Sequence, residues 1–404
     1  MRILIAHNRY QQPGGEDAVV KTEFNLLKDF GEEVRLYERT NDEINHYSVV
    51  QKINFLWNMG WSEDSYNDIR RVLKEFSPEV VHFHNIFFTL TPSVYQACRD
   101  EDIPVVQSLH NFRLLCSNGL FFRNNKVCEE CLDHKNLWRG VYYGCYRNSR
   151  LMTALMVRML KDHWDKRTWL DQINLYIAFT EFSRCKYITA GIPPEKIAVK
   201  PHVNPNHSSW ENSDKGYALF VGRLAPEKGV KVLLEAWKKR PLLPLKIVGD
   251  GPLATELKKE AQNIKQVEFL GFVSQDRCGD YMKGAKFLLI PSLCYENFTR
   301  VVAESYSYGI PVLASSLGGF PEVVLDKETG LLFRPGDADD LLTKIEWFLS
   351  HENYRSSMQQ NIRKVYATTY GARKNYETLM DIYKKAITNK KIDRGQMRTS
   401  QIML

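Results

Sequence analysis

The stretch AKFLLIPSLCYENFTRVVAESYSYGIPVLAS, residues 285–315, contains the alternation of elements that decides the fold. Residues 285–292 are an apolar run typical of a buried strand, residues 299–309 have the pattern of a helix that ends at Gly309, and residues 310–315 are a second apolar run. A strand, a helix and a strand in this order form a right-handed crossover, which makes the two strands parallel. The stretch therefore predicts parallel α/β structure.

The same alternation extends along the chain in both directions. Strand and helix patterns follow each other at 2–39, 66–85 and 92–111, and a second series begins at 217. Between the two series, residues 197–217 are rich in Pro, Asn and Ser and have the character of a linker. We therefore expect an α/β fold of two doubly wound parallel-sheet domains that face each other across a ligand cleft.

The domain boundaries are expected where the composition changes. A first domain should span 1–200 with a cysteine-containing insertion at 116–145, a second should span 201–375, and a C-terminal helix with a loose polar tail should occupy 376–404. The 404 residues are 44% hydrophobic and 25% charged, which is typical of a globular enzyme. The net charge of +7 is mild and does not indicate a nucleic-acid partner.

No apolar stretch indicates export or a membrane span. The first residues, MRILIAHNRYQQPGG, are a strand pattern that runs into a turn rather than a signal peptide, and no window approaches about 18 uninterrupted apolar residues. We therefore expect a cytoplasmic protein. Its eight cysteines should then be reduced thiols rather than a disulfide framework.

The turn VGRLAPEKG, residues 221–229, combines two cations with the start of a helix. Arg223 offers a planar fork of donors and Lys228 a point charge, and the free amides of the helix start add to both. This combination suits a diphosphate, although an ordinary charged turn has the same spacing.

The segment GDGPLA, residues 249–254, matches the fingerprint of a dinucleotide-binding turn. The match is weak, because it lies deep in the chain rather than in the first strand–helix unit and Pro252 stiffens its turn. We do not expect a nicotinamide or flavin cofactor.

Glu296 and Glu304 stand eight residues apart around the start of the helix expected at 299–309. If both were helical they would be separated by a rise of about 12 Å, which is too far for two carboxyl groups to share a proton. The separation matches the span between the sugar and the ribose of a nucleotide sugar, whose hydroxyls a carboxylate can bind. Two solvated acids on either side of a turn are the alternative.

The motifs taken together resemble a known family. GRLAPEKG, E-x7-E, GDGP, FLGFV, IPVLASSLGG with PEVV, and TGLLF in the second half, with PGGED, PEVVHFHN, SLHN and AGIPPEKIAVKPHVNP in the first, occur in this order in nucleotide-sugar-dependent glycosyltransferases of family 4. The resemblance covers about residues 1–375. It implies the GT-B fold, in which two Rossmann-like domains enclose the site.

The resemblance implies a role for each candidate of the second domain. Arg223 and Lys228 would bind the donor diphosphate and Glu304 the ribose hydroxyls. Glu296 would hold the transferred sugar together with the amides that follow it, those of Asn297, Phe298 and Thr299. The family often has glycine after the first glutamate where this chain has Asn297, which leaves the identity of the sugar open.

Other roles follow from the same resemblance. The backbone of Phe272 and Val273 would lie against the base, and Gly14 and Gly15 would form a loop that approaches the donor phosphates and the acceptor. His110, at the end of an expected strand, would point toward the sugar; from the residues alone it would be a structural hydrogen-bonding group.

The implied reaction has a physical basis in these residues. Breaking a sugar–phosphate bond builds negative charge on the leaving diphosphate, which two cations and a helix N-terminus stabilise, so no metal cofactor is expected for catalysis. Family 4 implies retention of the anomeric configuration, and transfer to a glycan or lipid-linked acceptor in bacterial surface polysaccharide assembly. The alternative is a non-catalytic protein that binds carbohydrate or nucleic acid.

The cysteines of the insertion have a spacing that bears on metal binding. Cys116, Cys128, Cys131 and Cys145 form the pattern C-x11-C-x2-C-x13-C, which supplies the four thiolates of a structural zinc site, and buried free thiols are an equal alternative. His82 and His84 lie on one face of a strand, but the sequence shows no third ligand at a diagnostic spacing, so we interpret them as structural or cleft-lining.

The segment 147–170 predicts a helix with Met and Leu over much of its surface and six basic residues around them. Such a helix usually belongs to a core. Exposed apolar residues flanked by cations would instead suit peripheral contact with an anionic membrane, at which a lipid-linked acceptor is presented.

Overall fold

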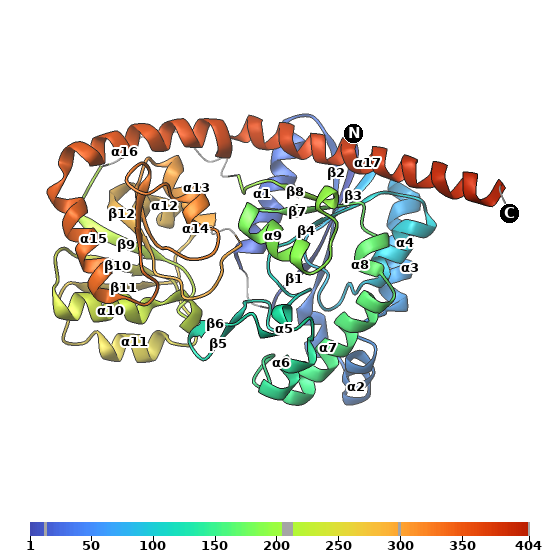
Figure 1. Cartoon of the computed structure of the whole chain (residues 1–404), viewed down its shortest axis with the longest axis horizontal. Helices are drawn as coiled ribbons and strands as arrows, with labels where there is room; N and C mark the ends of the chain where they lie inside the picture. Colours follow the sequence, from blue (N-terminus) through green and yellow to red (C-terminus); the bar gives the residue numbers. More distant parts are fainter. Residues whose placement is uncertain (12–13, 204–212, 298–299, 403–404) are drawn as a thin grey trace. The chain divides into compact units, whose positions relative to one another are not determined.

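The computed structural model describes residues 1–11, 14–203, 213–297 and 300–402. It divides into two compact units. Unit 1 comprises Met1–Gly119, Glu129–Val203 and Ala372–Leu404, and unit 2 comprises Leu120–Cys128 and Asn204–Gly371. Each unit is built around its own six-stranded sheet (Figure 1).

The sheet of unit 1 has the strand order β2-β1-β3-β4-β7-β8, and every neighbouring pair is parallel. The order reverses between β1 and β3, because the chain first adds β2 on one side and then continues on the other. All four residues of β3, β4 and β7 are buried, as expected for strands with helices on both faces. The strands are β1 (Arg2–Arg9), β2 (Glu33–Thr40), β3 (Val80–Phe83), β4 (Val105–Ser108), β7 (Leu175–Ala178) and β8 (Ile197–Val199).

The helices of unit 1 connect these strands and extend beyond one end of the sheet. They are α1 (Gly15–Asp29), η1 (Asn41–His46), α2 (Val49–Trp57), α3 (Glu63–Phe76), α4 (Ser93–Asp100), α5 (Glu130–Asp133), α6 (Trp138–Tyr143), α7 (Arg150–Asp165), α8 (Thr168–Asp171), α9 (Glu181–Thr189) and η2 (Pro194–Lys196). None of the described helices is long and apolar enough to cross a membrane.

The sheet of unit 2 has the order β11-β10-β9-β12-β13-β14, again parallel throughout. Successive residues of β12 point to opposite faces: Phe287 and Leu289 join one apolar core, and Leu288 and Ile290 join the other. The strands are β9 (Tyr217–Val221), β10 (Leu245–Val248), β11 (Val267–Gly271), β12 (Ala285–Ile290), β13 (Val312–Ser315) and β14 (Gly330–Phe333). Both sheets confirm the predicted fold of two Rossmann-like domains.

The helices of unit 2 cover both faces of this sheet. They are η3 (Pro226–Lys228), α10 (Val230–Lys239), α11 (Ala254–Glu260), α12 (Gln275–Gly284), α13 (Arg300–Ser307), α14 (Phe320–Val323), α15 (Ala338–Ser350), α16 (Glu352–Val365) and η4 (Tyr366–Tyr370). The helix expected at 299–309 is α13, and it joins the parallel strands β12 and β13 as predicted.

The last helix, α17 (Ala372–Ile402), returns to unit 1 and contacts α1, β3, β4 and β7. The ring of Tyr376 stacks on Phe30 with centroids 4.2 Å apart, and its hydroxyl donates to Glu32 at 2.5 Å. Asn375 donates to the carbonyl of Pro201 at 2.8 Å. The C-terminal segment is thus part of unit 1 rather than a separate piece, and its polar tail is helical to Ile402.

The cysteine-containing insertion is divided between the units instead of belonging wholly to the first. Strands β5 (Phe122–Arg123) and β6 (Lys126–Val127) form an antiparallel hairpin counted with unit 2, whereas α5 and α6 belong to unit 1. In unit 2 the ring of Phe121 meets that of Tyr295 edge-on, with centroids 6.2 Å apart.

Candidate functional site

The strand order of unit 2 reverses between β9 and β12, which lie side by side although their sequences are about 70 residues apart. Open parallel sheets bind ligands outside the carboxyl ends of the strands at such a reversal. The loop 222–229 follows β9 and the loop 291–297 follows β12. The two loops that carry the predicted residues Arg223, Lys228, Glu296 and Asn297 therefore meet at this position.

A glycine lets the two loops approach. Gly229 has a φ of +68°, and a Cβ at this position would lie 1.8 Å from the carbonyl oxygen of Pro291. The amide of Leu293 donates to the carbonyl of Glu227 at 2.8 Å. No other residue type fits this contact, so Gly229 fixes the distance between the cationic turn and the loop of Glu296.

Lys228 and Glu296, both predicted site residues, form an ion pair. The Lys228 Nζ lies 2.6 Å from the Glu296 Oε1, and the Ser292 hydroxyl donates to the same oxygen at 2.8 Å. Their side chains are 25% and 14% exposed. Burial by itself would lower the pKa of the Lys228 ammonium, but the Glu296 carboxylate outweighs burial and raises that pKa above its usual value.

Arg223, the second predicted cation, pairs with a carboxylate that the sequence analysis did not single out. The Arg223 guanidinium contacts Glu227, which is buried, while Arg223 itself is half-exposed. Glu227 lies in the predicted motif GRLAPEKG, but a buried acid cannot be distinguished there from a surface acid. The pairing holds the Arg223 guanidinium beside Glu227, the residue that precedes Lys228.

Glu304 lies inside α13 and has its own cationic partner. The Arg300 Nε donates to the Glu304 Oε1 at 2.6 Å, one helical turn away. Glu296 and Glu304 therefore bind different cations, which agrees with the prediction that they do not share a proton. Asn297 is buried beside Glu296, whereas Phe298 and Thr299 lie outside the described residues.

Phe272 and Val273 follow β11 on the same edge of the sheet of unit 2. Phe272 is 81% exposed, and Val273 packs partly against the core. The expected use of their backbone against a base stays a prediction.

The segment GDGPLA has a structural explanation. A Cβ on Gly249, whose φ is +135°, would lie 1.9 Å from the carbonyl oxygen of Gly222, and one on Gly251 would lie 2.6 Å from that of Leu224. The amide of Leu224 donates to the carbonyl of Asp250 at 2.9 Å. The close packing of this turn against the cationic loop accounts for both glycines without a dinucleotide.

Three residues predicted to approach the donor lie in unit 1. Gly14 and Gly15 begin α1, and a Cβ on either would meet no atom within 4 Å, so the fold leaves open space there. The amide of Gly14 donates to Asp17 at 2.7 Å. His110 follows β4 by two residues, is half-buried, and its Nε2 lies 2.9 Å from the Nδ1 of His84.

Two of the predicted zinc ligands lie beside polar groups of their own segment. Cys116 is buried with its Sγ 3.1 Å from the Asn118 Oδ1, and Cys131 lies 3.9 Å from the carbonyl of Leu137. None of the described cysteines of unit 1 belongs to a group of three potential metal ligands; in the described part of the chain that group is Glu23, His82 and His84. Zinc at the cysteines stays a prediction.

Two family models match the chain, one for each domain. Residues 14–203 match "Glycosyltransferase Family 4" and residues 206–365 match "Glycosyl transferases group 1". The two domains are those of a GT-B glycosyltransferase. The second match contains the loops of Lys228 and Glu296, and α17 lies beyond both matched ranges.

Curated relatives of the chain are also glycosyltransferases. The uncharacterized glycosyltransferase MJ1607 of Methanocaldococcus jannaschii is 26% identical over 87% of this chain and 87% of that protein. MJ1178 of the same organism is 32% identical over 43% of this chain, and the match spans 51% of that protein. The O-antigen chain mannosyltransferase B of Escherichia coli is 26% identical over 46% of this chain and 54% of that protein.

A solved structure shares the complete fold. Anabaena Alr3699/HepE, determined in complex with UDP, superposes with a TM-score of 0.65 over 94% of this chain and 99% of that chain, at 17% identity. This likeness supports the GT-B fold.

Proposed function

We propose that this glycosyltransferase transfers a sugar from a nucleotide-sugar donor, with retention of anomeric configuration, to a glycan or lipid-linked glycan acceptor. The observation that carries the proposal is the Lys228–Glu296 pair beside Arg223 at the strand-order reversal of unit 2. A donor diphosphate would meet two cations there, and the sugar would meet a carboxylate. Binding of UDP by the structural relative HepE supports a nucleoside diphosphate donor.

The proposed reaction exchanges one bond at the anomeric carbon for another. The bond from that carbon to the phosphate oxygen breaks, and a bond to the acceptor hydroxyl oxygen forms on the same face of the sugar. The acceptor proton passes to the leaving phosphate. Lys228 and Arg223 stabilise the charge that develops on the diphosphate, while Glu296 orients the sugar through its hydroxyls.

The acceptor is inferred from the chemistry of relatives. The similarity to the E. coli O-antigen chain mannosyltransferase supports a surface polysaccharide as the product. If the growing chain is linked to a lipid, as proposed here, the acceptor would be reached at a membrane surface. No observation favours the non-catalytic alternative.

Unit 1 has an exposed apolar surface that suits this location. Helix α2 has the sequence VVQKINFLW, and none of its nine residues is buried. Val49, Val50, Ile53 and Trp57 are 74%, 76%, 53% and 58% exposed. A helix this apolar is costly in water and indicates a contact surface.

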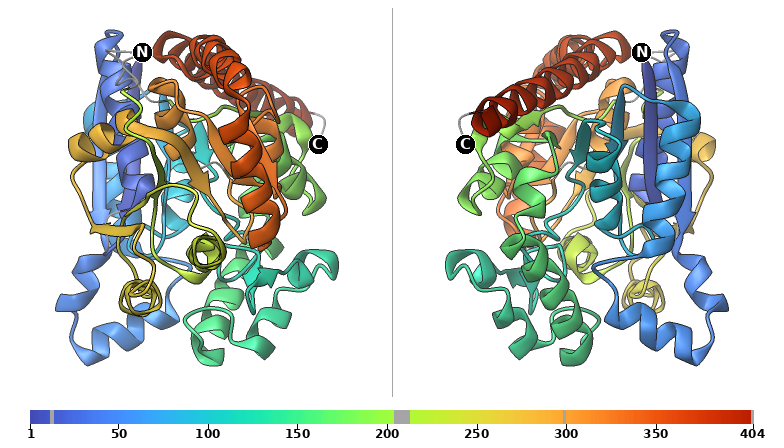
Figure 2. Two further views of the ribbon diagram at one scale, coloured as in Figure 1. Left: turned by 90° about the vertical axis from the view of Figure 1, so that its left-hand side faces the viewer. Right: turned by 90° about the vertical axis from the view of Figure 1, so that its right-hand side faces the viewer.

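Helices α6 and α7 extend this surface at the same end of unit 1 (Figures 1 and 2). The exposed residues here are Trp138, Tyr142, Tyr143 and Leu151. Arg158 of α7 donates to the Trp57 carbonyl at 3.1 Å and lies 5.1 Å from its ring, and Arg150 lies 5.8 Å from the ring of Tyr142. Met156 and Met159, which suggested membrane contact by α7, are instead buried in the core.

Exposed aromatic and aliphatic side chains bordered by arginine fit the headgroup region of an anionic bilayer. We therefore place the proposed peripheral membrane contact on α2 and α6, with the basic residues of α7 beside them. The contact would hold the acceptor domain at the surface where a lipid-linked glycan is presented.

The donor assignment is tested by thermal unfolding with UDP-, GDP- and ADP-sugars. One class of donor should raise the unfolding temperature, because a ligand that binds the folded chain alone stabilises it. NMR of the product formed with that donor should show the anomeric configuration of the donor. Stabilisation by NAD and by none of the sugar nucleotides would contradict the proposal, and an inverted product would contradict the proposed course of the reaction.

A further inference from the structure

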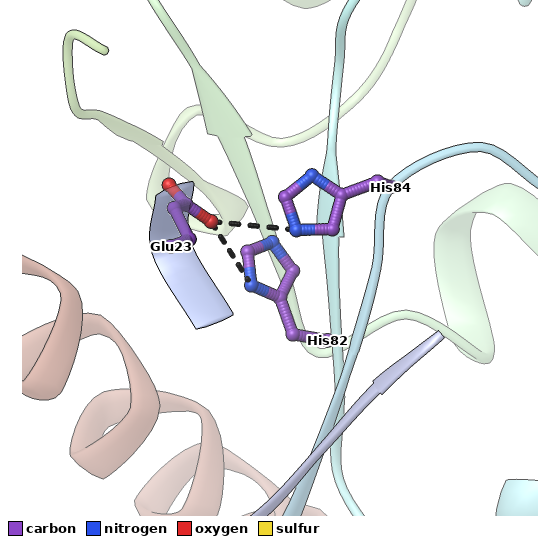
Figure 3. Close-up of side chains that lie close together, drawn as sticks. All are labelled: Glu23, His82 and His84. Carbon is purple, nitrogen blue, oxygen red and sulfur yellow. Dashed lines mark ion pairs between the residues drawn. The ribbon is translucent and has the colours of Figure 1, made fainter. Parts of the chain in front are cut away.

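A chain of buried polar groups runs through the core of unit 1 and ends at His110. Figure 3 shows its centre, where Glu23 of α1 faces His82 and His84 at the end of β3. Lys200, which follows β8, lies 2.5 Å from the Glu23 Oε1. The exposed fractions of Glu23, His82, His84 and Lys200 are 1%, 0%, 3% and 0%.

The three residues in Figure 3 have ligand atoms within 4.8 Å of one another, which is the spacing of a metal site. Lys200 argues against a metal, because it already neutralises Glu23 from the other carboxylate oxygen. A divalent ion would place two further positive charges in a buried site with no additional anion, at a large cost in desolvation. We interpret the cluster as a Lys200–Glu23 ion pair with neutral imidazoles.

The charges of the cluster follow from its surroundings. Burial by itself would raise the pKa of the Glu23 carboxyl, but Lys200 and the imidazoles outweigh it and hold that pKa well below its usual value. Burial, followed by the neighbouring imidazoles, lowers the pKa of His110 well below its usual value. Burial likewise lowers the pKa values of His82 and His84. At neutral pH Glu23 is therefore ionised and the three imidazoles are neutral, so each ring carries one proton, on either Nδ1 or Nε2.

The His82 Nδ1 lies 3.8 Å from the Glu23 Oε2, but two hydroxyls satisfy this ring. Its Nε2 lies 2.8 Å from the Ser108 hydroxyl and its Nδ1 lies 2.9 Å from the Tyr383 hydroxyl. A hydroxyl can donate or accept, so either tautomer of His82 is satisfied.

The proton of His84 is different, because the carboxylate lies nearer to one of its nitrogens, and among the described residues no hydroxyl pairs with that nitrogen. The His84 Nε2 lies 3.3 Å from the Glu23 Oε2. A lone pair on this nitrogen would be repelled by the carboxylate in a buried site, so the proton resides on Nε2. The His84 Nδ1 then has a lone pair, and at 2.9 Å it accepts the proton of the His110 Nε2. The Nδ1 of His110 is left without a proton.

We propose that Glu23, held by Lys200, is a positioning residue that acts through His84 to fix His110 as the Nε2-H tautomer, with the His110 Nδ1 as a hydrogen-bond acceptor for a substrate hydroxyl. Among the described residues, His110 makes its hydrogen bond through Nε2, and it lines a small pocket of unit 1 with His84, Asn111 and Arg113. The role of the His110 Nδ1 toward a substrate hydroxyl rests on the proposed function. The proton positions do not.

Glu23→Gln should reverse both tautomers. The cation of Lys200 attracts the amide oxygen of the new side chain, which turns its NH2 group toward the His84 Nε2. That nitrogen must then accept, so His84 carries its proton on Nδ1 and donates it to the His110 Nε2. The His110 Nδ1 becomes a donor and can no longer accept from a hydroxyl.

The test is 15N NMR of chain labelled with [15N]histidine, in which protonated and unprotonated ring nitrogens resonate far apart. His110→Gln and His84→Gln identify the signals. The native chain should show His110 protonated at Nε2, and Glu23→Gln should show it protonated at Nδ1. Tyr383→Phe is the matched control, because it removes a partner of His82 and should leave His84 and His110 unchanged.

A native His110 protonated at Nδ1 overturns the proposal even if Glu23→Gln fails to fold, and so does an unchanged tautomer in a folded Glu23→Gln chain. Initial rates of sugar transfer complete the test. Glu23→Gln should lower kcat about tenfold or more, as expected when a positioned proton acceptor is lost. Absence of transfer in the native chain, with the tautomers as stated, would contradict the proposed function and support the assignment of the protons.

Discussion

The Nζ of Lys228 lies 2.6 Å from the Oε1 of Glu296, across two loops whose residues are 68 positions apart. The pair joins the group expected to bind the diphosphate to the group expected to bind the sugar. Each side chain is positioned by the other, and Gly229 sets the distance between their loops. Donor affinity and sugar placement should therefore be coupled through this pair.

Lys228→Met should reduce kcat/KM for sugar transfer by about 10²–10³, the loss seen when one group that stabilises developing negative charge is removed. Lys231→Met is the control, because Lys231 lies on α10 nearby and pairs with Glu256 at the surface. The control should retain activity within about threefold, since exposed ion pairs contribute little. Equal activity of both variants would show that Lys228 does not take part in sugar transfer.

Two glycines should respond differently to alanine. Gly229→Ala places a Cβ against the Pro291 carbonyl at positive φ and should destabilise the chain by more than about 2 kcal/mol in urea unfolding. Gly15→Ala meets open space and should unfold like the native chain, yet it should lower transfer if the loop approaches the donor. Full activity of a stable Gly15→Ala chain would contradict that role.

The membrane surface is tested by sedimentation with vesicles. Val49→Ser, Val50→Ser and Ile53→Ser combined should weaken binding to anionic vesicles about tenfold or more, because exposed apolar area is lost without a change in charge. Tyr354→Ser, at an exposed aromatic position of unit 2, is the control and should bind like the native chain. Binding that is indifferent to lipid charge or to the triple substitution would rule the surface out.

Glu16 should make stability depend on pH. Burial raises the pKa of this carboxyl from 4.5 to about 7. A raised pKa means that the stabilising effect of the protonated form is complete below pH 4.5 and is lost as the pH rises through 7. Glu16→Gln, which stays neutral, should therefore gain about 2–4 °C in unfolding temperature over the native chain between pH 5 and pH 8.

Asp17 should make stability depend on pH in the opposite direction. Burial by itself would raise the pKa of Asp17, but hydrogen bonds from His7 and the Gly14 amide lower it. Its contribution is present above the usual pKa and is lost on acidification. Asp17→Asn should therefore be less stable than the native chain at pH 8. If the unfolding temperatures of Glu16→Gln and Asp17→Asn changed with pH in the same way, both pKa shifts would be contradicted.

The zinc hypothesis is settled by metal analysis of the purified chain. A zinc site formed by the cysteines should give about one equivalent of zinc, because structural sites bind one ion tightly with four ligands. Cys128→Ser with Cys131→Ser should abolish it, and Cys185→Ser, at an exposed cysteine outside the pattern, should not. A chain free of zinc would favour buried thiols.

Much of the fold and of unit 2's site follows from local pattern. The stretch 285–315 has apolar runs of strand length around a helix of the right period, and parallel strands require the crossover that the structure shows. The glycines and cations of 221–229 predicted the turn correctly. A tight turn needs glycine where φ is positive or where another backbone segment lies close, so its sequence is recognisable. The pairing of Arg300 with Glu304 is also local, since the two residues stand four positions apart on α13, but the sequence analysis did not single it out.

Other features could not be predicted because they join distant parts of the chain. Helix α17 was expected as a separate piece, since nothing in its sequence says which sheet it covers. The helix predicted at 147–170 was weighed for membrane contact, and its Met156 and Met159 are buried in unit 1. The exposure of α2 could not be predicted, because six apolar residues in nine normally indicate a core.

The sequence by itself determined the parallel α/β class, the two-domain division and the turn that carries Arg223 and Lys228, because periodicity, glycine and charge act over a few residues. The tertiary structure decided the partners: Lys228 with Glu296, Glu23 with Lys200 and His84, and α17 with unit 1. Those pairings arise where strands far apart in sequence become neighbours in a sheet. The cation or imidazole that lies beside a carboxylate, and therefore its pKa and its role, is known only once the sheet has formed.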